Sequence, residues 1–332
     1  MTVERLFNRG WHNDSPWLYP LIPVAKLFSV LARRRRSRLQ SQSQGKPFSA
    51  PVVVIGNISV GGSGKTPLII SLAKALTENG LKPGVVSRGY GGNAARYPLS
   101  VTVETTASES GDEPLLIARN TGCPVVVDPD RPRAVGYLLE KFDCDVVLSD
   151  DGLQHYALHR DIEVVVVDGE RGFGNQRLLP AGPLREPLSR LQEADFVVIN
   201  GELRNKTVPL PGATYSMMVH AMTLNNLASG ESIPVAEWAG SRDVHAVAGI
   251  GHPQRFADTL SELGFVVTLH PKNDHQLLSD KDIRFNDQKP VIITAKDAIK
   301  LTDTMPENVW VLTIEAVIQQ GFTDRLLKAI KG

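Results

Sequence analysis

The sequence predicts an α/β protein, in which a mostly parallel sheet of the P-loop NTPase type precedes a second, smaller α/β unit. Three observations predict this class. Short apolar runs alternate with helical patterns, a glycine-rich loop ending in GKT follows the first run, and the alternation resumes late in the chain. Apolar runs between helices are typical of parallel strands that are covered on both faces. A chain of 332 residues is long enough for about two such units.

The first unit shows its strands as short runs rich in valine and isoleucine. A helix is expected over residues 68–80, with Leu68, Leu72 and Leu76 on one side and Gly80 as its stop. The expected strands are residues 52–55, 84–87, 124–127, 145–149, 163–167 and 196–200.

Residues 206–240 mix polar and apolar side chains without a helical period, which predicts extended linker strands. Strand–helix alternation then resumes and ends in an amphipathic helix. The predicted organisation is an N-terminal helix and connection (1–46), a P-loop domain (47–205), the linker (206–240) and a smaller C-terminal α/β domain (241–332).

The N-terminal segment predicts a helix that lies in a membrane interface. Val24, Leu27, Phe28 and Leu31 share one helical face, and five arginines follow between positions 33 and 38. The apolar stretch 16–32 contains three prolines and a lysine and falls short of the ~20 residues that a spanning helix needs. Residues 37–47 are expected to form a flexible connection, and no cleavable signal peptide is expected.

Composition limits the functional classes. The formal net charge is zero, which argues against a dedicated nucleic-acid binder. Cys123 and Cys144 fit no metal-binding spacing, so we expect two small buried residues in a reducing compartment.

A phosphate-binding loop is predicted over Gly61, Gly62, Ser63, Gly64, Lys65 and Thr66. Glycines let the backbone turn its N–H groups toward phosphate oxygens at a helix N-terminus. The lysine would reach the β- and γ-phosphates and the Thr66 hydroxyl would hold Mg²⁺. Ser59 stands where the usual pattern has its first glycine, so a strand–helix turn without a ligand is the plain alternative.

The sequence lacks residues that are typical of two classes of P-loop protein, the partitioning ATPases and the GTPases. Val60 stands where the partitioning ATPases have a lysine. Of the NKxD pattern that binds guanine, the string NKTV (205–208) lacks the aspartate and the string TAKD (294–297) lacks the asparagine. A preference for guanine nucleotides is therefore unsupported.

Acidic and basic residues follow several of the expected strands. Asp150 and Asp151 end one strand, where a P-loop protein needs a carboxylate for Mg²⁺. Neighbours on an extended chain point opposite ways, so one is expected to face the metal, and Asp150 is slightly preferred over Asp151. A solvated DDG turn without a metal is the plain alternative. Asp112 in GDEP reads by itself as a helix cap, and His275 as a surface residue. Arg185 lies in a loop rich in proline and glycine.

Taken together, these strings resemble the tetraacyldisaccharide 4'-kinase family. GNISVGGSGKTP, VVSRGYGG, GDEP, DDGLQH, LLPAGPLREP and a late NDH occur in that order in the family, and the resemblance covers nearly the whole chain. It implies that ATP phosphorylates the 4'-hydroxyl of a tetraacylated glucosamine disaccharide 1-phosphate, the lipid A precursor, at the cytoplasmic face of the inner membrane.

The resemblance also implies roles for residues. Asp112 would serve as the base with support from His275, and Lys65, Asp150, Asp151 and Arg185 complete the expected catalytic set. Thr66 and Asp150 are the expected metal ligands, with ATP and Mg²⁺ as cofactors. The expected partners are the lipid and an anionic membrane surface, with no nucleic acid and no obligate protein partner. Two alternatives stay open: a P-loop nucleotide-switch regulator or metallochaperone, and a non-catalytic membrane scaffold.

Overall fold

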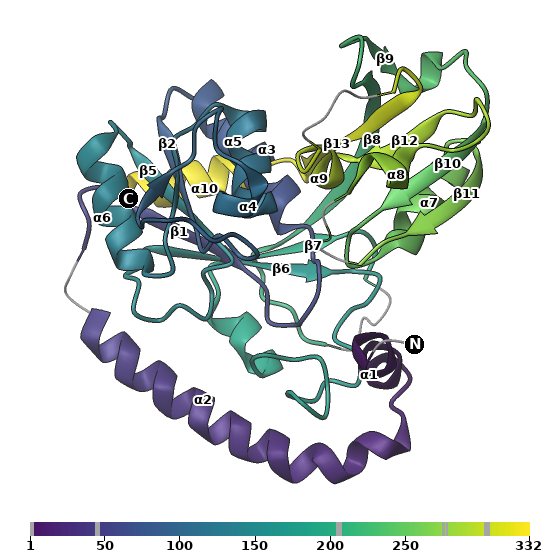
Figure 1. Ribbon diagram of the computed structural model, residues 1–332. Helices are drawn as coiled ribbons and strands as arrows, with labels where there is room; N and C mark the ends of the chain where they lie inside the picture. Colours follow the sequence, from purple (N-terminus) through teal and green to yellow (C-terminus); the bar gives the residue numbers. More distant parts are fainter. Residues whose placement is uncertain (1–2, 44–46, 204–207, 274–275, 277, 302–305) are drawn as a thin grey trace. The chain divides into compact units, whose positions relative to one another are not determined.

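The computed structural model (Figure 1) describes residues 3–43, 47–203, 208–273, 276, 278–301 and 306–332. The chain forms two compact units that alternate along the sequence. Unit 1 comprises Met1–Arg88, Cys123–Met218 and Val317–Gly332, and unit 2 comprises Gly89–Gly122 and Val219–Ala316.

Unit 1 contains the parallel sheet that the apolar runs predicted. Its strands follow the order β7-β6-β1-β5-β2-β4, and every neighbouring pair is parallel. The strands are β1 (Val52–Gly56), β2 (Pro83–Ser87), β4 (Val125–Val127), β5 (Val146–Asp150), β6 (Ile162–Asp168) and β7 (Phe196–Asn200). Every residue of these strands is buried, as expected for a parallel sheet with both faces covered.

The register of this sheet brings two predicted motifs together. Ile55 of β1 lies opposite Asp150 of β5, so the glycine-rich loop after β1 and the acidic pair after β5 begin side by side. Helices α3 (Lys65–Glu78), α6 (Arg131–Lys141) and α10 (Phe322–Lys331) and the 3-10 helix η2 (Leu188–Glu193) complete this part of unit 1.

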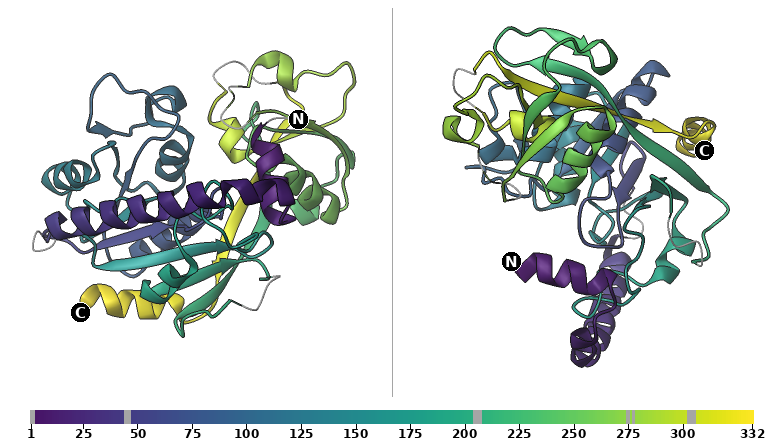
Figure 2. Two further views of the ribbon diagram at one scale, coloured as in Figure 1. Left: turned by 90° about the horizontal axis from the view of Figure 1, so that it is seen from below. Right: turned by 90° about the vertical axis from the view of Figure 1, so that its right-hand side faces the viewer.

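The N-terminal segment consists of α1 (Val3–His12), the 3-10 helix η1 (Pro16–Leu21) and α2 (Ile22–Ser43). Figure 2 shows α2 as one uninterrupted helix. The flexible connection expected from residue 37 was wrong as far as Ser43. Arginine, glutamine and leucine are good helix formers, and no glycine or proline follows Pro23 until position 45.

No single helix of the described residues has the length and apolar content to cross a membrane. One bent pair, Leu6–His12 with Pro16–Ser41, passes that test together, with a bend of 99° between its parts.

Unit 2 contains four further parallel strands of the same sheet, in the order β11-β10-β12-β13. Its strands are β10 (Asp243–Ala248), β11 (Val266–Pro271), β12 (Val291–Thr294) and the unit 2 part of β13 (Val309–Ile318), and its helices here are α7 (Pro253–Glu262), α8 (Asp280–Ile283), α9 (Ala295–Ala298) and the 3-10 helix η3 (Val235–Glu237). Residues 89–122 add β3 (Leu99–Ser100), α4 (Ala107–Ser110) and α5 (Asp112–Thr121).

The division into units departs from the boundaries that the sequence predicted. Residues 89–122 belong to unit 2, because ion pairs join α5 to residues of and after α9. Helix α10 belongs to unit 1, where Phe322 packs edge-on against Phe196 and Tyr215. Such contacts between distant parts of the chain leave no local sequence pattern.

Two long strands pass from one unit to the other. The unit boundary at Met218 falls within β8 (Thr214–Asn226), and the boundary at Ala316 falls within β13. Within residues 206–240, β8 pairs with the short antiparallel β9 (Ser232–Pro234). The second long strand that passes between the units is therefore β13, which lies outside the predicted linker range.

Cys123 and Cys144 are both partly exposed. The expectation that both are buried was wrong. Burial nevertheless raises the pKa of the Cys144 thiol to about 11, which keeps it protonated at neutral pH.

Candidate functional site

The glycine-rich loop has a backbone shape that only glycine adopts readily. Gly61 and Gly64 have φ angles of 101° and 91°, in the left-handed region. A side chain on Gly64 would lie 2.4 Å from Asn200 Nδ2, so the close approach of that amide also requires glycine. The loop delivers the chain directly into α3, which begins at Lys65.

This loop presents unused hydrogen-bond donors. Within the described part of the chain, the backbone N–H groups of residues 61–66 donate no hydrogen bond. The hydroxyl oxygen of Ser63 is buried and also has no hydrogen-bond partner there. Unpaired donors at a helix N-terminus form a site for an anion such as phosphate.

Three side-chain amides hold the loop in this shape. Asn57 Nδ2 donates to Gly61 O and Asn200 Nδ2 donates to Ser63 O, each at 3.2 Å. Gln154 Nε2 donates to Asn57 O at 3.0 Å. Sequence reasoning missed all three residues. The position of two of them could have indicated a role at the site, because Asn200 ends the FVVIN strand and Gln154 lies in the DDGLQH string.

Lys65 and Asp151 form an ion pair at the start of α3. Lys65 Nζ lies 3.3 Å from Asp151 Oδ1, and Arg185 Nη1 lies 3.4 Å from Asp151 Oδ2. Burial opposes ionisation of Asp151, but the two cations outweigh it and hold the pKa of this carboxyl below its ordinary value. The structure thus brings together three of the predicted catalytic residues.

Asp150 has different partners from its neighbour. It is 1% exposed and accepts a hydrogen bond from Ser87 Oγ at 2.9 Å. The buried Arg131 donates to the backbone oxygen of Asp150 at 2.7 Å. Burial lowers the pKa of Arg131 to about 10, against the opposing effect of Asp150 and Asp151, so it remains charged at neutral pH. Arg131 thereby fixes the strand end that carries both acids.

The loop that carries Arg185 lies along the phosphate loop. Arg185 N donates to Ile58 O at 2.7 Å, and Val60 N donates to Pro183 O at 2.9 Å. Ser59 forms an isolated antiparallel bridge with Leu184. The position where the usual P-loop pattern has glycine is therefore part of an extended pairing, which serine accommodates.

Glu186, two residues after Leu184, helps to hold the pairing of Ser59 with Leu184 in place. Its carboxylate is buried and accepts hydrogen bonds from Gln154 Nε2 at 2.7 Å and from the Tyr156 hydroxyl. Arg190 also lies beside it, with Nε 3.4 Å from Glu186 Oε2. Since Gln154 and Tyr156 belong to the DDGLQH segment and its continuation, this cluster joins the acidic strand end to the loop of Arg185.

In unit 2, Asp112 occupies the first position of α5. The preceding Gly111 has a φ of 84°, and a side chain there would lie 2.5 Å from Tyr90 O. The SRGYGG and GDEP strings therefore pack against each other. The helix has no side-chain cap at its N-terminus, so Asp112 does not act as the cap that its sequence context suggested.

Asp112 is 6% exposed, and its Oδ2 lies 3.3 Å from Lys300 Nζ. Sequence reasoning placed Asp112 in the P-loop domain, but it belongs to unit 2. His275, its predicted support, lies outside the described residues.

Residues 17–331 match the family model for tetraacyldisaccharide-1-P 4'-kinase (LpxK). The chain belongs to this family. It is 45% identical to the tetraacyldisaccharide 4'-kinase of Alcanivorax borkumensis over 100% of the chain and 99% of that protein, and 44% identical to that of Hahella chejuensis over 96% and 94%.

A solved structure agrees with these relatives. A crystal structure of LpxK from Aquifex aeolicus in complex with ATP superposes with a TM-score of 0.78 at 30% identity, covering 95% of this chain and 98% of that one. The mostly parallel α/β fold predicted from the sequence is thereby confirmed.

Proposed function

We propose that this chain uses ATP to phosphorylate the 4'-hydroxyl of a tetraacyl glucosamine disaccharide 1-phosphate, a precursor of lipid A. The observation that carries the proposal is membership of the kinase family over nearly the whole chain. The same finding argues against the nucleotide-switch regulator, because the relatives are named tetraacyldisaccharide 4'-kinases.

The phosphate loop supports ATP as the phosphoryl donor. Its free N–H groups, Gly61 to Thr66, and the Lys65 ammonium suit a polyphosphate. Arg185 would stabilise the charge that spreads over the transferring phosphoryl group, since it is held beside the loop. Phosphoryl transfer needs mainly such positioning and charge neutralisation.

Mg²⁺ fits the oxygen donors at this end of unit 1. Among the described residues, no cluster of three His, Cys, Asp or Glu side chains forms a metal cage. Mg²⁺ commonly keeps several waters and takes one or two carboxylates together with substrate phosphates. Thr66 with Asp150 or Asp151 would hold the ion, which would neutralise phosphate charge.

Asp112 would accept the proton of the attacking sugar hydroxyl, with His275 supporting it. The support for Asp112 is a carboxylate placed at a helix start and paired with a cation rather than used as a cap. The proposed role for His275 rests on the family resemblance alone.

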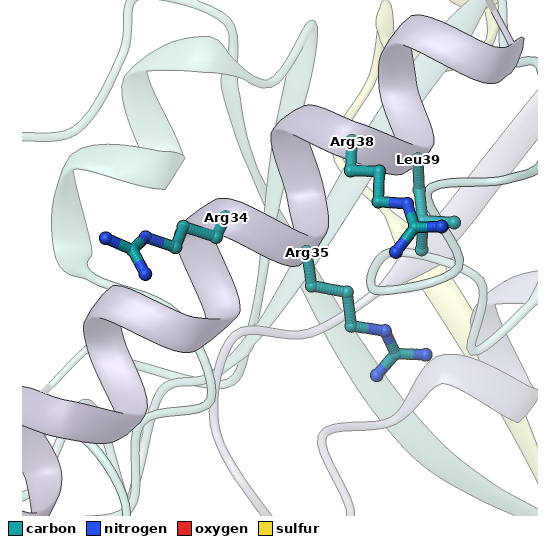
Figure 3. Close-up of a pocket in the computed structure, with 4 residues that line it drawn as sticks. All are labelled: Arg34, Arg35, Arg38 and Leu39. Carbon is teal, nitrogen blue, oxygen red and sulfur yellow. The ribbon is translucent and has the colours of Figure 1, made fainter.

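The N-terminal helices are proposed to hold the protein at the cytoplasmic face of the inner membrane. Trp17, Val24, Leu27 and Leu31 are all exposed. Figure 3 shows Arg34, Arg35 and Arg38 projecting from α2, the helix that also carries Val24, Leu27 and Leu31. Apolar side chains beside exposed arginines favour an anionic bilayer surface, at about 1 kcal/mol for each basic residue near it.

The direct experiment incubates the purified protein with labelled ATP, Mg²⁺ and a detergent-dispersed disaccharide lipid. We expect the label to appear on the lipid. A 4'-phosphatase should then release this label as phosphate. Hydrolysis of ATP without lipid phosphorylation, stimulated instead by a protein partner, would favour the regulator.

A further inference from the structure

Lys300 is a buried cation beside the proposed base. It follows α9, and its side chain is 0% exposed. Its Nζ lies 3.3 Å from Asp112 Oδ2 and 3.2 Å from Asp297 Oδ1. Two backbone carbonyls, those of Gly249 and Gln276, lie at 3.5 and 3.4 Å. A buried ammonium group surrounded by four oxygens has a fixed position, because each contact restricts its motion.

Asp297 holds this lysine from the other side. Asp297 is 0% exposed, and its Oδ2 accepts hydrogen bonds from Gly249 N at 3.0 Å and Thr294 Oγ1 at 2.7 Å. Its remaining oxygen is directed to Lys300. Gly249 and Thr294 therefore orient the Asp297 carboxylate, and Asp297 in turn orients Lys300 toward Asp112.

A second contact fixes the two segments to each other. Lys296 Nζ lies 3.5 Å from Glu113 Oε1, so two lysines of the TAKDAIK string contact two consecutive acids of GDEP. This pair is more exposed than the Lys300 pair, with side-chain exposures of 18% and 35%. The buried contact carries the larger electrostatic effect, because water screens it less.

We propose that Lys300, held in place by Asp297, positions the carboxylate of Asp112 for accepting the proton of the sugar hydroxyl. This inference rests on the proposed role of Asp112 as base. Lys300 is a positioning residue in this scheme, and it takes no proton itself.

The test measures kcat and the KM for ATP for the full chain, with detergent-dispersed lipid as acceptor. For Lys300→Met we expect kcat to fall about 10²-fold through misplacement of the base. We also expect the KM for ATP to be unchanged. Lys289→Met is the control, because Lys289 pairs with the partly exposed Asp243 at 2.9 Å elsewhere in unit 2.

Asp297→Asn tests the same role with a smaller change, and it replaces Lys300→Met if that variant fails to fold. It weakens the ion pair that holds Lys300 and keeps the side-chain volume, so kcat should fall while the KM for ATP and the melting temperature change little. An unchanged kcat in both variants, or in Asp297→Asn when it alone folds, overturns the inference.

The double variant Asp112→Asn/Lys300→Met distinguishes the inference from the function on which it rests. If Lys300 acts through Asp112, the double variant should be no less active than Asp112→Asn alone. A fully active Asp112→Asn would overturn the base assignment itself. An inactive Asp112→Asn with multiplicative losses in the double variant would leave the base assignment standing and overturn the role of Lys300.

Discussion

At the scale of single residues, Lys65 is already partnered in the structure. Its ammonium group lies 3.3 Å from Asp151, which Arg185 also contacts. A phosphate in the loop would add a second anion to this cluster, and the two cations supply charge for both. The ion pair with Asp151 therefore holds the Lys65 side chain in place beside the phosphate loop before a phosphate binds.

Lys65→Ala should lower kcat by ~10²–10³, or about 3–4 kcal/mol, because one charged contact to the transition state is lost. Steady-state kinetics and a thermal melt measure the effect, and the fold should persist. Lys74→Ala is the matched control, since Lys74 is exposed on the same helix α3. Near-normal turnover of Lys65→Ala would contradict the assignment of the phosphate loop.

Asp112→Ala and His275→Ala should each lower kcat heavily with little change in ATP affinity. General-base help is typically worth ~10²–10⁴ in rate. If the two residues act as a unit, the double variant should be scarcely worse than the more damaging single variant. Kinetics of all three variants decide this, and losses that multiply would mean two independent roles.

Some residues of the site could be predicted from the sequence and others could not. Lys65, Thr66 and Asp151 lie within strings whose spacing has a chemical reason, so they could be predicted. Asn57, Asn200 and Arg131 act through backbone atoms of other segments. Nothing in the local pattern distinguishes an asparagine that holds a loop from one that faces water, so these needed the structure.

At the scale of elements, the segment between β5 and β6 joins the acidic strand end to a cluster of arginines. Arg160 donates to the backbone oxygens of Leu153 and His155, and Arg36 lies over the ring of Tyr156. Burial, together with Arg131 and Arg160, lowers the pKa of His155 to about 4. The folded protein therefore keeps this imidazole neutral at pH values where the unfolded chain protonates it.

This shift predicts an acid-dependent loss of stability. The unfolded chain binds the extra proton below a pKa of about 6.5, so stability is full above that value and falls as pH drops toward 4. His155→Gln should flatten this part of the curve of melting temperature against pH. His159→Gln in the same segment is the control, because that ring lies beside Asp161. An unchanged slope in His155→Gln would contradict the prediction.

At the scale of the whole molecule, the sequence predicted the elements better than their grouping. The valine-rich strands β1, β5 and β6 follow from local apolar runs, because a strand buried on both faces is apolar over most of its length. The assignment of residues 89–122 to unit 2 depends on pairs such as Asp112 with Lys300. These partners are far apart in the chain, and one sequence without relatives carries no signal of such a contact.

The N-terminal helices combine contacts within unit 1 and an exposed apolar face. Trp11 Nε1 donates to Pro180 O at 3.0 Å, Leu18 is fully buried, and Arg36 pairs with Glu193. Deleting the segment would therefore remove packing as well as any membrane contact. Substitutions on the exposed face separate these two effects.

The double variant Leu27→Glu/Leu31→Glu should lose binding to anionic vesicles and keep its melting temperature. Both side chains are more than half exposed, at 60% and 55%, so their replacement breaks little packing. Each new carboxylate would remove apolar area from the interface and repel anionic headgroups. Val103→Glu/Ile314→Glu is the matched control, since both residues are exposed in unit 2.

Co-sedimentation with vesicles and kinase assays measure the outcome. Activity should fall on bilayer-embedded lipid and persist on detergent-dispersed lipid, because only the first requires attachment. Undiminished co-sedimentation of the Leu27→Glu/Leu31→Glu variant would show that this face does not bind the membrane.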